Sequence, residues 1–116
     1  MPLVILNGPI IAAGESLSDA IDCTAGRVVR ITMSADWSDA PLTFQLSSDG
    51  FGFNNLFDPH AKEIIFEVQP GSAVLVPAGM ASALAHLKFR SGLADHPVKQ
   101  SARREFSIAL ETPEAP

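Results

Sequence analysis

The chain has 116 residues, of which 47% are hydrophobic and 18% charged, and its formal net charge is −5. This length suits one domain with its own core, and the hydrophobic content excludes a disordered chain. Residues 1–58 hold seven acidic residues against only Arg27 and Arg30, so no nucleic-acid-binding surface is expected, because phosphate contacts need clustered cations. Cys23 is the single cysteine, which excludes an internal disulfide and favours a buried structural thiol.

Short segments with β-strand character follow one another from the N-terminus. Leu3–Leu6 and Ile10–Ala12 are apolar and are separated by an Asn7-Gly8-Pro9 sequence that is typical of a turn. Leu17–Cys23 is a weaker strand, because Asp19 lies on the face of its apolar residues and needs a bulge or an exposed position.

The middle of the chain shows the alternation of antiparallel strands with one buried face. In Val28–Met33, the inward residues are expected to be Val29, Ile31 and Met33. In the next strand Leu42, Phe44 and Leu46 alternate with the outward residues Thr43, Gln45 and Ser47. Asp49-Gly50 predicts a hairpin, and Phe53–Phe57 is the return strand.

The second half continues the pattern. Strands are predicted around Ile64, Phe66 and Val68, over Val74–Val76, at Leu87 and Phe89 with His86, Lys88 and Arg90 outward, and at Phe106, Ile108 and Leu110. Residues 78–85 are the one helical candidate, and a single short turn is expected there. We therefore predict an all-β fold, an antiparallel β-sandwich or jelly roll of eight or nine short strands. Its predicted core is Ile31, Leu42, Phe44, Phe66, Leu87, Phe89, Phe106 and Ile108.

The N-terminal segment is more apolar than one sandwich edge requires. We expect residues 1–11 to be an extension that docks on a neighbouring subunit through Leu3, Val4, Ile5 and Leu6, or that adds a strand to it. The sandwich domain is then residues 12–112, with a C-terminal tail over 113–116. No signal peptide pattern opens the chain, which predicts a protein made in the cytoplasm.

Few residues suggest chemistry. Asp36 and Asp39 flank Trp37 and could bind calcium or act as an acid–base pair, although two carboxylates in a loop more often form hydrogen bonds within turns. His60, His86 and His96 are too scattered for a metal site. There is no G-x-S-x-G elbow and no phosphate-binding loop. The sequence therefore predicts no enzyme, no cofactor and no metal.

Aromatic residues are the remaining candidates for contact with a ligand or partner. Trp37, Phe51 and Phe53 lie in or next to expected loops. Exposed rings there would form a platform for a sugar or a protein, whereas a buried Trp37 would close one end of the sandwich.

Four segments together resemble a known family. They are "IAAGESLSDAID" (Ile11–Asp22), "RVVRITMSADW" (Arg27–Trp37), "LTFQLSSDG" (Leu42–Gly50) and "LKFRSGLADHPVKQ" (Leu87–Gln100). This combination is similar to small proteins encoded in the gene clusters of tailed phages, prophages and gene-transfer-agent-like particles. The hairpin and the late strand also resemble galactose-binding-like, discoidin-type jelly rolls.

The first resemblance implies a non-enzymatic virion protein: a head spike, fibre base or decoration component. It would form a homo-oligomer and contact capsid, spike or fibre proteins, with no nucleic acid or membrane as partner, after assembly in the bacterial cytoplasm. Two alternatives stay open. One is a neck or tail attachment protein, and the other is a carbohydrate-binding module for adsorption to host surface glycans.

Overall fold

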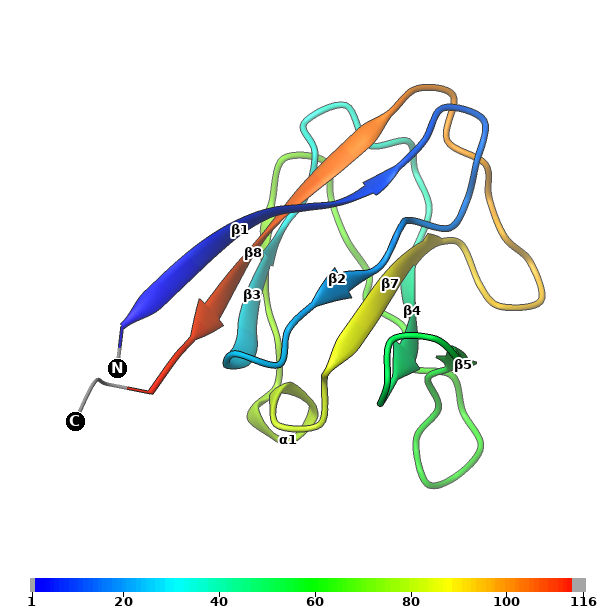
Figure 1. The fold of residues 1–116 in the computed structure, drawn as a ribbon. Helices are drawn as coiled ribbons and strands as arrows, with labels where there is room; N and C mark the ends of the chain where they lie inside the picture. The colour runs from blue at the N-terminus through cyan, green and yellow to red at the C-terminus, as the bar shows by residue number, and fades with distance from the viewer. Residues whose placement is uncertain (1, 114–116) are drawn as a thin grey trace.

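The computed structural model describes residues 2–113, which form two four-stranded antiparallel sheets packed face to face (Figure 1). The first, called the β1 sheet, has the order β1 (Leu3–Ile11), β8 (Arg104–Glu111), β3 (Arg27–Thr32), β6 (Ala73–Leu75). The second, called the β7 sheet, has the order β2 (Ile21–Asp22), β7 (His86–Ser91), β4 (Leu42–Ser47), β5 (Asn54–Asn55). The predicted all-β sandwich is confirmed.

The strand pairing is that of a jelly roll. β1 pairs with β8, β2 with β7, β3 with β6 and β4 with β5, so the described chain is one long hairpin folded over on itself. Every connection crosses from one sheet to the other except the β4–β5 hairpin. This nesting is characteristic of eight-stranded jelly rolls.

Phenylalanine rings join the two sheets through the core. Phe89 of β7 lies between Phe44 of β4 and Phe106 of β8, with ring centroids 5.4 and 4.8 Å away in edge-to-face geometry, an arrangement that adds to the energy of burial alone. Seven of the eight predicted core residues are at most 1% exposed. Phe66 is only partly buried and packs its ring on Phe44 at 4.9 Å.

The N-terminal segment differs from the expected two short pieces. Residues 3–11 form one strand that pairs with β8 from Leu3 opposite Glu111 to Ile11 opposite Arg104, with a shift of register between Asn7 and Ile10. The Asn7-Gly8-Pro9 sequence therefore forms a bulge within a strand instead of a turn. Because β1 is the edge strand of its sheet, the domain boundary expected after residue 11 falls inside the sandwich.

Other differences have similar physical causes. A register shift between Val28 and Arg30 places Val28 in the core and leaves Val29 partly exposed, the reverse of simple alternation. Thr43, Ser47 and Arg90, expected outside, are buried.

Several elements are shorter than expected. The predicted helical segment contains one turn, α1 (Ala78–Ala81), and the strand expected around Phe66 reduces to an isolated bridge to Leu42. Of the predicted tail, residues 114–116 lie outside the described residues.

No helix in the described part of the chain has the length and apolar character needed to cross a membrane.

Candidate functional site

Trp37 is buried and does not form a contact surface. Its side chain is 4% exposed, its ring packs edge-on against Phe106 at 5.5 Å, and its indole N–H donates to the Ala40 carbonyl at 3.1 Å. This burial agrees with the alternative that Trp37 closes one end of the sandwich, and it leaves no exposed indole for the expected ligand contact.

Asp36 is the partner of a buried arginine. Arg104, at the start of β8, donates from Nη1 to Asp36 Oδ2 at 2.9 Å, from Nε to Gln100 Oε1 at 2.9 Å and from Nη2 to Ser38 Oγ at 3.1 Å. The Ser34 hydroxyl, followed by the Arg104 guanidinium, lowers the pKa of Asp36. No group of three or more metal-ligating side chains occurs among the described residues. Both Asp36 and Asp39 are exposed, and Asp36 is paired with Arg104.

Gln100 is the centre of this network. It is fully buried, and its Oε1 also accepts the Ser38 backbone N–H at 3.1 Å while its Nε2 donates to Ser91 Oγ at 2.8 Å. Each polar atom of the amide is satisfied, as a buried amide requires. Sequence reasoning missed Gln100 because a lone glutamine in a loop carries no periodic signal.

A second buried arginine holds the outer side of the β7 sheet. Arg90 donates to Glu63 Oε2 and to Asn55 Oδ1, and both Glu63 carboxylate oxygens accept the Ala94 backbone N–H at 3.1 Å. Burial lowers the pKa of Arg90, although Glu63 opposes that shift. The loop that carries Glu63 covers the strand face here, which explains why Arg90 and Thr43 are buried.

The remaining titratable candidates also have structural roles or none. Cys23 is fully buried, and burial followed by the Asp22 charge raises its pKa to about 12, so it is neither accessible nor a thiolate at neutral pH. His96 is exposed beside Asp95. No ligand-sized pocket is present in the described part of the molecule, and the candidate sites that remain are on its surface.

One surface candidate is the outer edge of β1, which has a closed half and an open half. In the closed half, the Ile10 N–H donates to Asp19 Oδ1 at 2.8 Å and the Ile10 carbonyl accepts the Asp19 N–H at 3.1 Å. The neighbouring Ser18 bonds to Phe89 of β7 through both its N–H and its hydroxyl. The segment around Ser18 and Asp19 therefore connects the two sheets and covers this half of the edge.

In the open half, the backbone groups directed away from β8 can be identified from one hydrogen bond. The Thr112 N–H donates to the Pro2 carbonyl at 3.0 Å. Because hydrogen-bonded and non-hydrogen-bonded pairs alternate in an antiparallel ladder, Val4 and Leu6 bond to β8, while Leu3, Ile5 and Asn7 point outward. The bulge inverts this alternation, so beyond it the backbone groups of Ile10 point outward, in agreement with their hydrogen bonds to Asp19. No other described segment bonds to the outward groups of these three residues.

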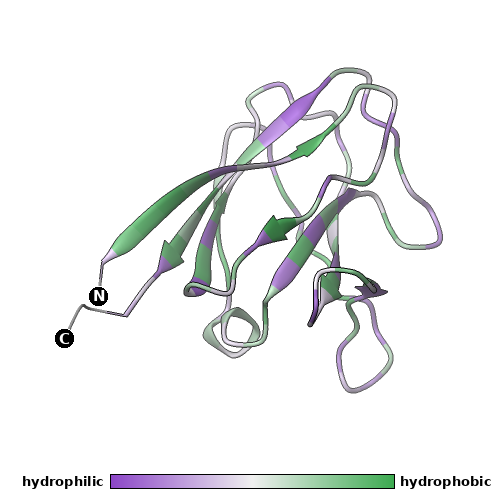
Figure 2. Ribbon diagram, viewed as in Figure 1, coloured by the Kyte–Doolittle hydropathy of each residue, from purple (hydrophilic) through white to green (hydrophobic). Residues whose placement is uncertain are grey.

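The side chains of the open half are apolar and exposed. Of the four residues predicted to dock, Leu3, Val4 and Ile5 are 51%, 42% and 50% exposed, whereas Leu6 is half-buried against the core. Figure 1 shows this end of β1 and the end of β8 extending beyond the β7 sheet. In Figure 2 this end of β1 is coloured as hydrophobic. There is no charged residue from Pro2 to Ile11.

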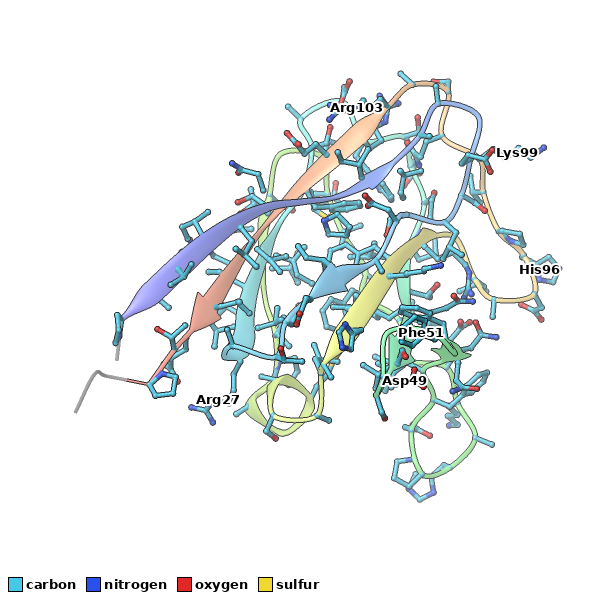
Figure 3. All side chains as sticks on the ribbon, in the orientation of Figure 1. Arg27, Asp49, Phe51, His96, Lys99 and Arg103 are labelled. Carbon is cyan, nitrogen blue, oxygen red and sulfur yellow. The ribbon has the colours of Figure 1, made fainter. Side chains whose placement is uncertain are left out.

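The second surface candidate is Phe51, which is 90% exposed in the loop after β4 (Figure 3). The loop is held by Asp49, whose carboxylate accepts the backbone N–H groups of Phe51 at 2.9 Å and Gly52 at 3.2 Å. These two bonds, followed by the Ser47 hydroxyl, lower the pKa of Asp49. The predicted aromatic contact is therefore exposed on a well-bonded loop.

Phe53 lies near Phe51 in sequence but in a different environment. It is partly buried, and the Lys88 ammonium lies 4.6 Å from its ring centroid, a cation–π contact within the described chain. The covered ring leaves Phe51 as the free aromatic side chain of this loop.

Comparisons with known proteins give no further assignment. No family model, no curated protein and no solved structure matches the chain.

Proposed function

We propose that this protein is a non-enzymatic structural component of a tailed-phage or phage-like particle, placed on the head as a spike, fibre base or decoration protein. It acts through contacts with copies of itself and with other particle proteins. The observation that carries the proposal is the open half of β1, an uncharged, apolar strand edge with unpaired backbone groups. Soluble proteins usually protect such edges, and an edge left open is suited to assembly.

The residues behind the family resemblance support the same function. Trp37, Arg90 and Gln100 belong to the quoted segments, and each is buried in a contact that holds the sandwich together. Gly92 of the same segment has φ +91°, and a Cβ there would lie 2.6 Å from the His96 carbonyl oxygen. Motifs that specify a rigid domain, without a reactive group, are what a structural family requires.

The fold allows this function without selecting it. Jelly rolls occur in viral capsid proteins and in lectins, and fold alone does not determine function. The topology therefore agrees with both the structural proposal and the glycan-binding alternative.

Quantitative mass spectrometry of purified particles from the source organism tests the proposal. We expect a fixed copy number relative to the major capsid protein, and that number separates a head surface component from a neck or tail ring. Absence of the chain from purified particles, with the major capsid protein present, would contradict the proposal.

Phe51 supports a second candidate, a carbohydrate-binding role in adsorption. A largely exposed ring on a loop whose backbone is hydrogen-bonded to Asp49 is preorganised to stack on a sugar or to enter a partner's pocket. A glycan array with the wild-type chain and Phe51→Ala tests it, and Phe57→Ala is the matched control because Phe57 is 48% exposed. Binding lost only with Phe51→Ala supports the role, and no binding on the array removes it.

A further inference from the structure

We infer that the open half of β1 pairs with the same segment of a second copy, antiparallel and with Ile5 on the twofold axis. This inference rests on the proposed function, since it names the partner of the same surface. The two β1 sheets then join into one continuous sheet across the dimer.

The length of the open edge fixes the register. Asn7 is the last outward residue before the bulge, and beyond it Asp19 occupies the backbone groups of Ile10. At the other end, β1 begins at Leu3, and Pro2 is directed toward β8 through its bond with Thr112, so Leu3 is the first outward residue of the described strand. The available segment is therefore residues 3–7, and its midpoint is Ile5.

Hydrogen bonding around this midpoint is complete. A twofold axis at Ile5 places Leu3 opposite Asn7 of the second copy and Ile5 opposite its own equivalent. All three residues have both a free N–H and a free carbonyl directed outward, so each pair can exchange the two bonds of a hydrogen-bonded antiparallel pair. If the register is displaced by two residues, only two of these three outward residues on each chain find a partner within residues 3–7.

The side chains that meet across this edge are compatible. Ile5 meets Ile5 on the outer face of the sheet, and Val4 meets Leu6 on the inner face. Residues 3–7 carry no charge, so the twofold pairing brings no like charges together. An isologous contact of this kind closes at two copies and does not propagate into a fibre.

The second copy is favoured over the other edge of the same sheet as the occupant. β6 is only Ala73–Leu75 and offers too short a strand to match residues 3–7. A β1–β6 contact would also be head-to-tail and would continue indefinitely. Self-pairing of β1 uses the longest open edge of the described chain on both sides of the contact.

Sedimentation of the purified chain tests the pairing. A five-residue edge gives a small interface, so we expect a reversible dimer that forms between about 10 µM and about 1 mM. Ile5→Pro removes an outward N–H without removing a bond to β8, and it should weaken the dimer by about tenfold or more, which is 1.4 kcal/mol. If Ile5→Pro perturbs the fold, as seen by circular dichroism, Ile5→Lys replaces it, because a charge on the edge opposes pairing.

A cross-link tests the register. Ile5→Cys places two thiols opposite each other across the axis, at the Cα separation of about 5.5 Å that a disulfide accepts, and buried Cys23 does not compete. Mild oxidation should convert this variant to a covalent dimer well before Leu75→Cys, the control on β6, whose native side chain is 79% exposed.

Three results overturn the self-pairing. They are a monomer at about 1 mM, a dimer of unchanged strength in both Ile5 variants, and cross-linking of Ile5→Cys no faster than that of Leu75→Cys. These outcomes are distinct from failure of the proposed function. A chain present in particles but monomeric alone would overturn the self-pairing and leave the proposed structural role in place.

Discussion

The two halves of β1 belong to one strand and pair with the same neighbour, yet they differ in what covers their outer edge. At Ile10 the edge is closed by Asp19, next to a fully bonded polar network around Arg104. From Leu3 to Asn7 the described chain leaves the edge uncovered, and its side chains are apolar. One end of the strand is therefore held by hydrogen bonds within the chain, while the other end leaves backbone groups without a partner in the described residues.

The largest effect is expected from breaking the polar network at the closed end. Gln100→Ala removes the hydrogen-bond partner of the Arg104 Nε–H, of the Ser38 backbone N–H and of the Ser91 hydroxyl. We expect the free energy of unfolding to fall by about 3–5 kcal/mol, measured by urea denaturation. Lys99→Ala, at the exposed neighbouring position, is the control and should change it by less than about 0.5 kcal/mol. Equal stability of the two variants would contradict the structural role of Gln100.

Trp37→Ala separates stability from contact in the same region. Because the indole is buried against Phe106 and bonded to Ala40, we expect a loss of about 3 kcal/mol. Phe51→Ala, which removes an exposed ring, should change stability by less than about 0.5 kcal/mol. Thermal denaturation of both variants measures this difference, and the reverse order of stability would show that the two rings have been assigned the wrong roles.

A pair of adjacent proline variants compares the two sides of the open half. Val4→Pro removes an N–H that bonds to β8, and we expect it to cost about 1–3 kcal/mol. Ile5→Pro removes an outward N–H and should cost less than about 1 kcal/mol, since proline is tolerated at a solvent-facing edge position. Urea denaturation of dilute monomer is the measurement. Equal losses would mean that the outward and inward groups have been assigned incorrectly.

The smallest effect is on the pH dependence of stability. Hydrogen bonds lower the pKa values of Asp36 and Asp49 in the folded chain, so the unfolded chain takes up protons first as the pH falls below about 4. The stability from these carboxylates is present above that pH and is lost as the pH falls through their lowered folded values. Urea midpoints measured between about pH 5 and about pH 2 should decline less steeply in the Asp36→Asn, Asp49→Asn double variant than in the wild type.

The alternation of residues was sufficient to predict the sandwich but not the positions where the ladder shifts. Phe44, Phe89 and Ile108 follow a strict two-residue period and lie in the core as predicted. The same rule fails at Val28, where a bulge inverts the faces, because a bulge is set by pairing with distant strands. Asn7-Gly8-Pro9 has the composition of a turn, and only its pairing with β8, about a hundred residues later in sequence, makes it part of a strand.

The candidate surfaces were predictable to a similar extent. The excess of apolar residues at Leu3–Ile5 and the aromatic residue in the hairpin at Phe51 were visible from composition alone. The cover that Asp19 provides for Ile10 was not, because it depends on how the jelly roll brings two segments together. The buried arginines were also missed, since alternation predicts which side of a strand a residue faces and does not show whether a loop covers that side.

Amide hydrogen exchange by NMR tests the central claim, the half-open edge of β1, most directly. In dilute monomer, the amides of Val4, Leu6 and Ile10 should be protected, while those of Leu3, Ile5 and Asn7 exchange rapidly. At about 1 mM the three rapid amides should become protected together. Protection of Ile5 in dilute monomer would show that the chain itself covers this edge and would contradict the account.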